Sequence, residues 1–401
     1  MKTFRPLHLR IHCAAALLVL SCGGANAEPY VPASDTRILA RVPAALLEDP
    51  TLKRLRDEHG RAPDDLSVAT DLAWRYLALA RRTGALRYLG YAEAALRIWW
   101  TARTPPTPVL ALRASIAQSW HEFDRSLEDL ERLLMRDPRN ATAWLMASTI
   151  QKVTGRPVDA LGSCRVLRRT GTPLLHAACR ANALSMTARA RRAYEVLDTF
   201  LGESKMAAPG ERQWALWVLA GLAAELELHG AADEHYAQAL AVATPDLNLL
   251  VAYADHLLDT GRPRAALDLL DGLERKAPAV LRRAIALTRL SDPEVSTEVD
   301  WLRTHFADLR LRGDAGQAGD EARFELYVLG NSERALELAA SNFEIHREGS
   351  DIRLLLDAAL EARLTESAKQ AIAWLDTIGY TSPAFELRRE RFTAMMAKGK
   401  T

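Results

Sequence analysis

The sequence predicts an all-α protein in which antiparallel helix hairpins follow one another along the chain. Hydrophobic residues make up 49% of the 401 residues, but aromatic ones only 6%, and this composition favours closely packed helices. Runs of β-branched residues, which favour strands, are scarce. The most informative observation is a repeated octapeptide, because TGRPVDAL, beginning at Thr154, returns as TGRPRAAL, beginning at Thr260.

Each copy of the octapeptide predicts a turn between two helices. Gly155 and Gly261 can adopt the left-handed conformation that ends a helix. Pro157 and Pro263 stand where the next helix begins, a position at which a missing N–H costs nothing. A phosphate-binding loop is excluded, because no strand is expected before either glycine and no GxxxxGK[ST] pattern surrounds them.

The spacing of the two copies indicates the length of the repeating unit. The two glycines, residues 155 and 261, are 106 positions apart, and one third of this spacing is about 35 residues. Small residues, Ala160 and Ala266, follow each glycine by five positions and let paired helices approach closely. Gly84 and Gly230 predict further turns. We therefore expect about nine helix hairpins, near residues 66–102, 108–136, 140–169, 173–202, 211–243, 246–276, 279–312, 320–346 and 350–378.

The two ends of the array are expected to differ from the hairpins. Residues 379–401 are expected to hold a tail and a last amphipathic helix, Ala384 to Met396, which caps an apolar face without a further neighbour. Residues 28–65 contain five prolines and are expected to be extended, apart from a short helix near Thr51 to His59.

The repeated units resemble the tetratricopeptide repeat family, whose units are about 34 residues long and consist of two antiparallel helices. The matching positions in the two best units are Trp144, Gly155 and Ala160, and Tyr253, Ala254, Gly261, Ala266 and Pro278. The resemblance covers roughly residues 66–377. It implies that the hairpins coil into an α-α superhelix, or solenoid, whose concave face is lined by the first helix of each hairpin and binds peptides or partner proteins.

Residues 1–27 predict an export signal. Lys2, Arg5 and Arg10 provide a positively charged start, residues 11–20 an apolar core too short to span a bilayer, and residues 25–27 a small-residue cleavage site. We therefore expect an exported, periplasmic bacterial protein.

An alternative is a lipid anchor to the outer membrane. Residues 19–23 resemble a bacterial lipoprotein box, in which Cys22 would become the lipidated first residue. No later segment is long and apolar enough to be expected to cross a membrane.

Cys164 and Cys179 are expected to form a disulfide. They lie at equal distances from a turn at residues 170–173, on two antiparallel helices, and an exported protein meets an oxidising compartment. Two buried thiols are the alternative, and a metal site that includes His176 is a further one with only three ligands.

No motif predicts catalysis or a cofactor. HExxH and GxSxG patterns are absent, and no serine or cysteine nucleophile stands beside His256, Asp255 and Asp259. The formal net charge is only +1 and no basic stripe is present, so nucleic acid is not an expected partner.

We expect a non-enzymatic scaffold that binds a protein or peptide on the concave face. The alternatives are a binder of small molecules or glycans and, third, an enzyme with its site in the atypical segment 279–320. An open groove would favour the scaffold, and a closed pocket with converging carboxylates or histidines the alternatives. Placed by helix spacing, the expected concave-face residues are Asp71, Trp74, Arg81, Gln118, Lys152, Asn182, Trp217, Asn248 and Asp255.

Overall fold

The computed structural model describes residues 49–243, 247–273, 275–312, 318–364 and 366–398. The expected export signal, Cys22 and the expected extended segment up to residue 48 lie outside the described residues. Within the described ranges every regular element is a helix, and no strand is present. No helix in these ranges has both the length and the apolar character needed to cross a membrane.

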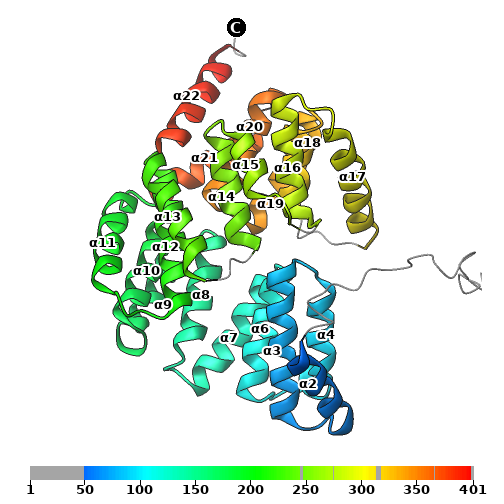
Figure 1. Cartoon of the computed structure of the whole chain (residues 1–401). Coiled ribbons are helices and arrows are strands. Elements are labelled where there is room, and N and C mark those ends of the chain that lie inside the picture. The colour runs from blue at the N-terminus through cyan, green and yellow to red at the C-terminus, as the bar shows by residue number, and fades with distance from the viewer. Residues whose placement is uncertain (1–48, 244–246, 274, 313–317, 365, 399–401) are drawn as a thin grey trace, which may run out of the picture. The chain divides into compact units, whose positions relative to one another are not determined.

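Nine helix hairpins follow one another in the described chain, as expected (Figure 1). A short helix, α2 (Pro50–Arg61), precedes them and α22 (Pro383–Lys398) follows them. The first hairpins are α3 (Leu66–Thr83) with α4 (Arg87–Ala95) and α5 (Arg97–Trp100), α6 (Thr107–Ser119) with α7 (Phe123–Arg136), α8 (Ala141–Val153) with α9 (Pro157–Thr170), and α10 (Pro173–Leu184) with α11 (Ala190–Glu203). The later ones are α12 (Pro209–Glu225) with α13 (His229–Val242), α14 (Leu247–Asp259) with α15 (Pro263–Leu269), α16 (Ala277–Leu290) with α17 (Val295–Arg312), α18 (Ala318–Tyr327) with α19 (Ser332–Ile345), and α20 (Gly349–Ala362) with α21 (Glu366–Ile378).

The two octapeptides form the expected turns. Gly155 and Gly261 have φ values of 78° and 72°, in the left-handed region where glycine is favoured. Pro157 and Pro263 are the first residues of α9 and α15. The expectation for Gly230 is wrong by three residues, because Glu227 adopts the left-handed conformation (φ 56°) and Gly230 lies inside α13.

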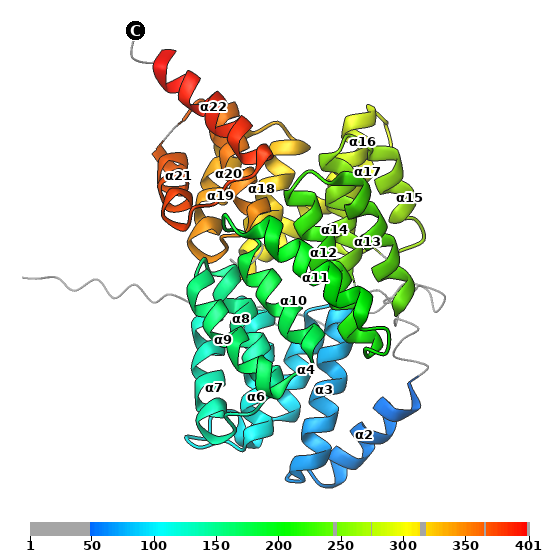
Figure 2. The same ribbon diagram turned by 90° about the vertical axis from the view of Figure 1, so that its left-hand side faces the viewer.

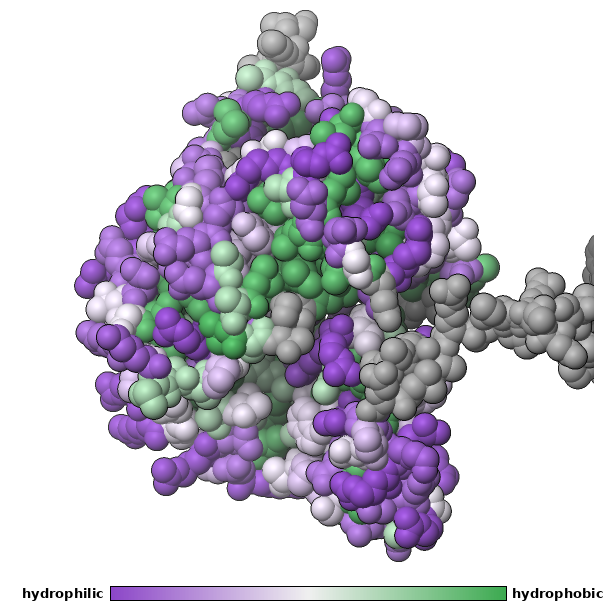
Figure 3. All heavy atoms as spheres, viewed as in Figure 1, coloured by the Kyte–Doolittle hydropathy of each residue, from purple (hydrophilic) through white to green (hydrophobic). Residues whose placement is uncertain are grey.

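The helices pack mainly against their neighbours in sequence. Ala160 and Ala266, the small residues predicted at the crossings, are fully buried. The buried apolar clusters follow the chain, and one of them joins α10 to α14 while another joins α18 to α22. In Figure 3 hydrophilic side chains cover most of one face, and apolar ones gather near its centre.

The late hairpins also return to the early ones (Figure 2). The backbone N–H of Arg347 donates a hydrogen bond to the carbonyl of Val153, at 2.8 Å. Gly155 lies so close to Arg347 and Trp374 that a Cβ at this glycine would come within 2.8 Å of both side chains. Segments far apart in the sequence are therefore held together directly.

The expected disulfide is confirmed. Cys164 of α9 and Cys179 of α10 are bonded, with their Cα atoms 5.6 Å apart, and both are buried. The Ser148 hydroxyl of α8 lies 3.0 Å from the Cys164 sulfur and 3.3 Å from the Cys179 sulfur. The bond therefore joins two successive hairpins at a point where α8 also packs. A disulfide also indicates an oxidising compartment.

Replacing both cysteines by alanine should lower the free energy of unfolding by about 3 kcal/mol, because a loop of this length closed by a disulfide restricts the unfolded chain. Urea unfolding of the wild type and of the double variant, each with and without reductant, measures the effect. Reductant should affect only the wild type. Two thiols that react with an alkylating agent in the unreduced, denatured protein would contradict the bond.

Candidate functional site

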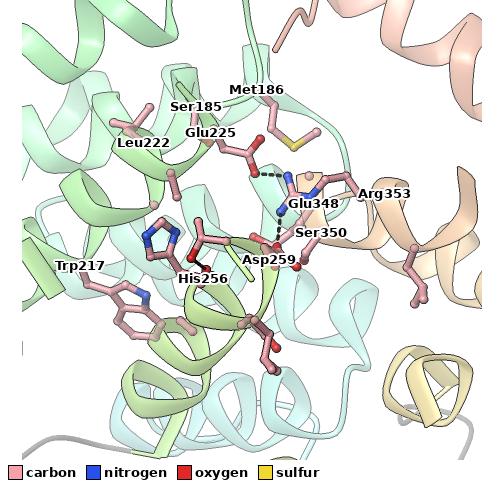
Figure 4. Close-up of a pocket in the computed structure, with 18 of the residues that line it drawn as sticks. Ser185, Met186, Trp217, Leu222, Glu225, His256, Asp259, Glu348, Ser350 and Arg353 are labelled. Atoms are coloured by element: carbon pink, nitrogen blue, oxygen red, sulfur yellow. Dashed lines mark hydrogen bonds and ion pairs between the residues drawn. The ribbon is translucent and has the colours of Figure 1, made fainter. Parts of the chain in front are cut away.

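A cavity of about 740 Å³ lies on the inner side of the hairpin array (Figure 4). Most of its wall comes from the C-terminal halves of the first helices of six successive hairpins, α8, α10, α12, α14, α16 and α18. The N-terminal part of α20 completes it. The polar residues of the lining are Thr149, Lys152, Asn182, Ser185, Glu225, Glu227, His229, Asp255, His256, Asp259, Thr260, Arg289, Arg323, Glu348, Ser350, Arg353, Asp357 and Arg388.

The start of α20 closes the cavity against α8 and α12. Glu348, the residue before α20, forms an ion pair with Lys152 of α8, and this lysine, together with His346 and Arg323, lowers the pKa of Glu348 against partial desolvation. Gly349 faces Glu225 of α12 so closely that a Cβ would lie 2.6 Å from its Oε1 atom. The inner face is therefore bridged by the chain itself, and does not form an open groove here.

Glu225 is the centre of a buried polar cluster on this bridge. Its carboxylate lies 2.6 Å from the Arg353 guanidinium and accepts a hydrogen bond from the Tyr380 hydroxyl. Burial alone would raise the pKa of Glu225, but Arg353 and Tyr380 lower it below its usual value. The glutamate is therefore ionised, and three elements, α12, α20 and the segment before α22, are joined at one carboxylate.

A second network fixes the opposite wall. Arg282 of α16 is buried between Asp255 and Asp320 and contacts both carboxylates at 2.8 Å. Burial would raise the pKa of Asp320, but Arg282 holds it below its usual value. Asp357 of α20 likewise accepts two hydrogen bonds from Arg388, at 2.7 and 2.8 Å.

Aromatic side chains provide the apolar part of the lining. Trp214 and Trp217 project from α12, and Tyr236 from α13. The Tyr236 ring stacks on that of Tyr253, with centroids 4.8 Å apart. Next to it His256 is buried, with its Nε2 atom 3.5 Å from Asp233, and burial lowers its pKa.

The cavity includes four of the nine residues expected on the concave face. Lys152, Asn182, Trp217 and Asp255 line it, each from a different first helix. The other five are outside the lining: Asp71, Trp74, Arg81, Gln118 and Asn248. Three of these belong to α3, which does not reach the cavity, and Asn248 stands at the opposite end of α14.

Several lining residues were not predicted. Glu225 and Asp259 occupy equivalent positions at the ends of α12 and α14, 34 residues apart, so the repeat period could have identified this pair. Glu348 and Arg353 belong to a late hairpin that reaches the cavity only through the return of the chain, and no local pattern indicates this.

The described residues contain no group of His, Cys, Asp or Glu side chains arranged to hold a metal ion. The cysteines considered with His176 are joined in the disulfide instead. Segment 279–320 contributes Ile285 and Arg289 to the lining. In comparisons with known proteins, no family model matches the chain, and no curated protein matches it either.

A histidine pair also links an early hairpin to a late one. Nδ1 of His121, in the turn between α6 and α7, lies 2.6 Å from Nε2 of His346, at the end of α19. Burial and the neighbouring His346 imidazole lower the pKa of His121 to about 4. The carboxylates of Asp320 and Asp351 act in the opposite direction but are outweighed. Burial also lowers the pKa of His346, with Glu348 opposing and Arg323 reinforcing this shift.

Stability should therefore fall as the pH is lowered from about 6.5 to about 4. In this window the unfolded chain binds protons that the folded pair excludes, so acid favours unfolding, by on the order of 2 kcal/mol. Urea unfolding at a series of pH values measures the slope. His346→Phe, which keeps an aromatic ring, should reduce this slope, whereas His59→Gln in α2, away from the pair, should not. An unchanged slope in His346→Phe would contradict the assignment.

Proposed function

We propose that this protein is a non-enzymatic binding protein that holds a small polar molecule in the inner cavity of a tetratricopeptide-like superhelix. The observation that carries the proposal is the bridging of the inner face by Glu348, Gly349 and Arg353. An extended polypeptide would need an open groove, whereas a cavity of about 740 Å³ has the size of small-molecule sites.

The repeat length, the left-handed glycines at the turns and the nine hairpins support the superhelix. The disulfide supports an exported location, and we propose the periplasm, after removal of residues 1–27 or with a lipid on Cys22. Three lining carboxylates, Glu348, Glu225 and Asp357, are paired with lining cations, which supports a role in binding over one in acid–base chemistry.

Gly221 offers a direct test of the cavity. It lies in α12 and lines the cavity, and a Cβ placed there would have no neighbour within 4 Å. Gly221→Leu should therefore place a side chain in the cavity and obstruct it without loss of stability, since leucine favours a helix over glycine by up to about 1 kcal/mol. Gly202→Leu, at an exposed position of α11 that is equally free of neighbours, is the matched control.

Native mass spectrometry of protein purified without denaturation should show a retained small molecule in the wild type and in Gly202→Leu, but not in Gly221→Leu. Urea unfolding of all three chains checks that the fold is unaffected. Retention of the same molecule by Gly221→Leu, or a wild type that carries none from its native compartment, would argue against the proposal.

A second candidate function, the recruitment of a protein partner, is favoured by exposed apolar side chains on the first hairpin. Trp74 is 38% exposed, and Tyr91 and Ile98 are each 48% exposed, on α3, α4 and α5. Exposed aromatic residues of this kind often anchor partners.

A photo-crosslinking amino acid at position 74 should then give one dominant adduct in cells. The control is the same amino acid at Met206, whose side chain is 97% exposed. Equal, diffuse crosslinking at both positions would remove this candidate.

A further inference from the structure

A local excess of positive charge lies on the third and fourth hairpins, although the formal net charge of the whole chain is only +1. Between Ala160 and Tyr194 the sequence has seven arginines and neither a lysine, an aspartate nor a glutamate. All seven are exposed: Arg165, Arg168, Arg169, Arg180, Arg189, Arg191 and Arg192. None of them lines the cavity, so this charge lies outside the inner site.

These arginines are largely without carboxylate partners. Among the residues that the structure describes, only Arg192 pairs with a carboxylate, that of Glu195 at 3.2 Å. The two side chains are exposed and one turn apart on α11, and such surface pairs are weak. The other six guanidinium groups form no ion pair with the described part of the chain. This surface therefore presents positive charge that the protein itself does not neutralise.

The disulfide holds two of these arginines at the same level. Cys164 and Cys179 have Cα atoms 5.6 Å apart, and Arg165 and Arg180 follow them directly on α9 and α10. One residue step of about 3.8 Å on each side limits the Cα atoms of the two arginines to a separation of about 13 Å. The cysteines are buried and the arginines exposed, so both guanidinium groups leave adjacent helices toward solvent.

The exposed face of α9 carries a second arginine and an aliphatic side chain. Val158, Arg165 and Arg169 are seven and four positions apart, so they share one face of the helix. Gly162 lies between them on this face, and a Cβ placed there would meet no atom within 4 Å. Val158 is 77% exposed. This face is therefore open, and it combines positive charge with an apolar group.

Arg168 also lies near Arg180. Partial burial lowers the pKa of His176 of α10, and the positive charges of Arg180 and Arg168 lower it further, so both guanidinium groups are close to this imidazole. α10 packs against both α9 and α11, and Figure 2 turns these three helices toward the viewer. Arg165, Arg168, Arg169 and Arg180 thus form one basic patch on the outer side of the array.

The start of α11 extends the positive charge to a third helix. Arg189 is the N-cap of α11, and Arg191 and Arg192 lie in its first turn, which has no acidic residue. The N-terminal end of a helix carries a partial positive charge, so cations there weaken the helix. Local choices that oppose the fold are typical of surfaces kept for function.

We propose that the outer face of α9, α10 and the start of α11 docks on an anionic phospholipid surface. Guanidinium groups bind phosphate through paired hydrogen bonds, and each basic side chain near an anionic membrane adds to the attraction. Val158 supplies an aliphatic group for the headgroup layer. The inference goes beyond the proposed function, because the basic patch and the cavity share no residue.

A lipid surface fits the basic patch better than other polyanions do. The arginines are spread over three helices, so an acidic protein would need carboxylates fixed at matching positions. Headgroup phosphates move laterally and gather around the arginines wherever these stand. No aromatic residue lies between Ala160 and Ala193, so the patch lacks the stacking groups of sites for single-stranded nucleic acids.

Flotation with vesicles tests the proposal. One set of vesicles is phosphatidylcholine alone, the other an equal mixture of phosphatidylcholine and phosphatidylglycerol. The protein is the unlipidated chain from residue 28 onward, with its disulfide intact. It should bind the mixed vesicles and not the neutral ones. Raising the salt from about 0.1 M to about 1 M should abolish binding, because the Debye length falls from about 10 Å to about 3 Å.

The variant Arg165→Gln/Arg169→Gln/Arg180→Gln should weaken binding to the mixed vesicles by on the order of 100-fold, since each arginine near an anionic surface contributes about fivefold. The matched control is Arg82→Gln/Arg303→Gln/Arg391→Gln, which removes the same charge from exposed positions on α3, α17 and α22. This control should bind nearly as well as the wild type. Circular dichroism checks that both variants are folded.

Equal binding to neutral and mixed vesicles, or an equal loss in the two triple variants, would overturn the inference. A folded wild type that does not bind the mixed vesicles would also overturn it and leave the patch to an acidic protein. The proposed function fails separately. Gly221→Leu should bind vesicles like the wild type, whether or not it loses the small molecule of the cavity.

Discussion

The return of residues 345–353 onto α8 and α12 is the constraint on which the cavity depends. Within this short stretch Arg347 bonds to the Val153 carbonyl, Glu348 pairs with Lys152, and Arg353 pairs with Glu225. An array of hairpins that contact only their neighbours would leave its inner face open to solvent. Here the start of the ninth hairpin bridges this face, which holds a cavity of about 740 Å³.

This closure explains why so many charges lie on the inner face. Ion pairs removed from water are costly unless both partners are well hydrogen-bonded, and losing one partner of a buried pair costs about 3–5 kcal/mol. Glu225 with Arg353 and Tyr380, and Arg282 between two aspartates, meet that condition. Because these pairs are directional, they specify how the late hairpins sit on the early ones.

The two octapeptides show how one local sequence acquires two roles. Both glycines end a helix in the left-handed conformation, as their sequence context requires. Around Gly261 the space is open, whereas Gly155 receives Arg347 and Trp374 of the returning segment at close approach. Gly155 is therefore needed both for its backbone conformation and for its lack of a side chain, while Gly261 is needed for its conformation alone.

The sequence by itself determined the local structure: nine hairpins with their turns, the capping helix, and the Cys164–Cys179 bond all follow from short-range patterns. It also placed Lys152, Asn182, Trp217 and Asp255 on the inner face, because helix periodicity defines which side a residue occupies. Only the tertiary structure decided that Glu348 and Arg353 complete the site, and that Trp74 does not belong to it. The physical reason is that small rotations between successive hairpins accumulate along the array, so the meeting of distant hairpins depends on all the crossings together and on no single motif.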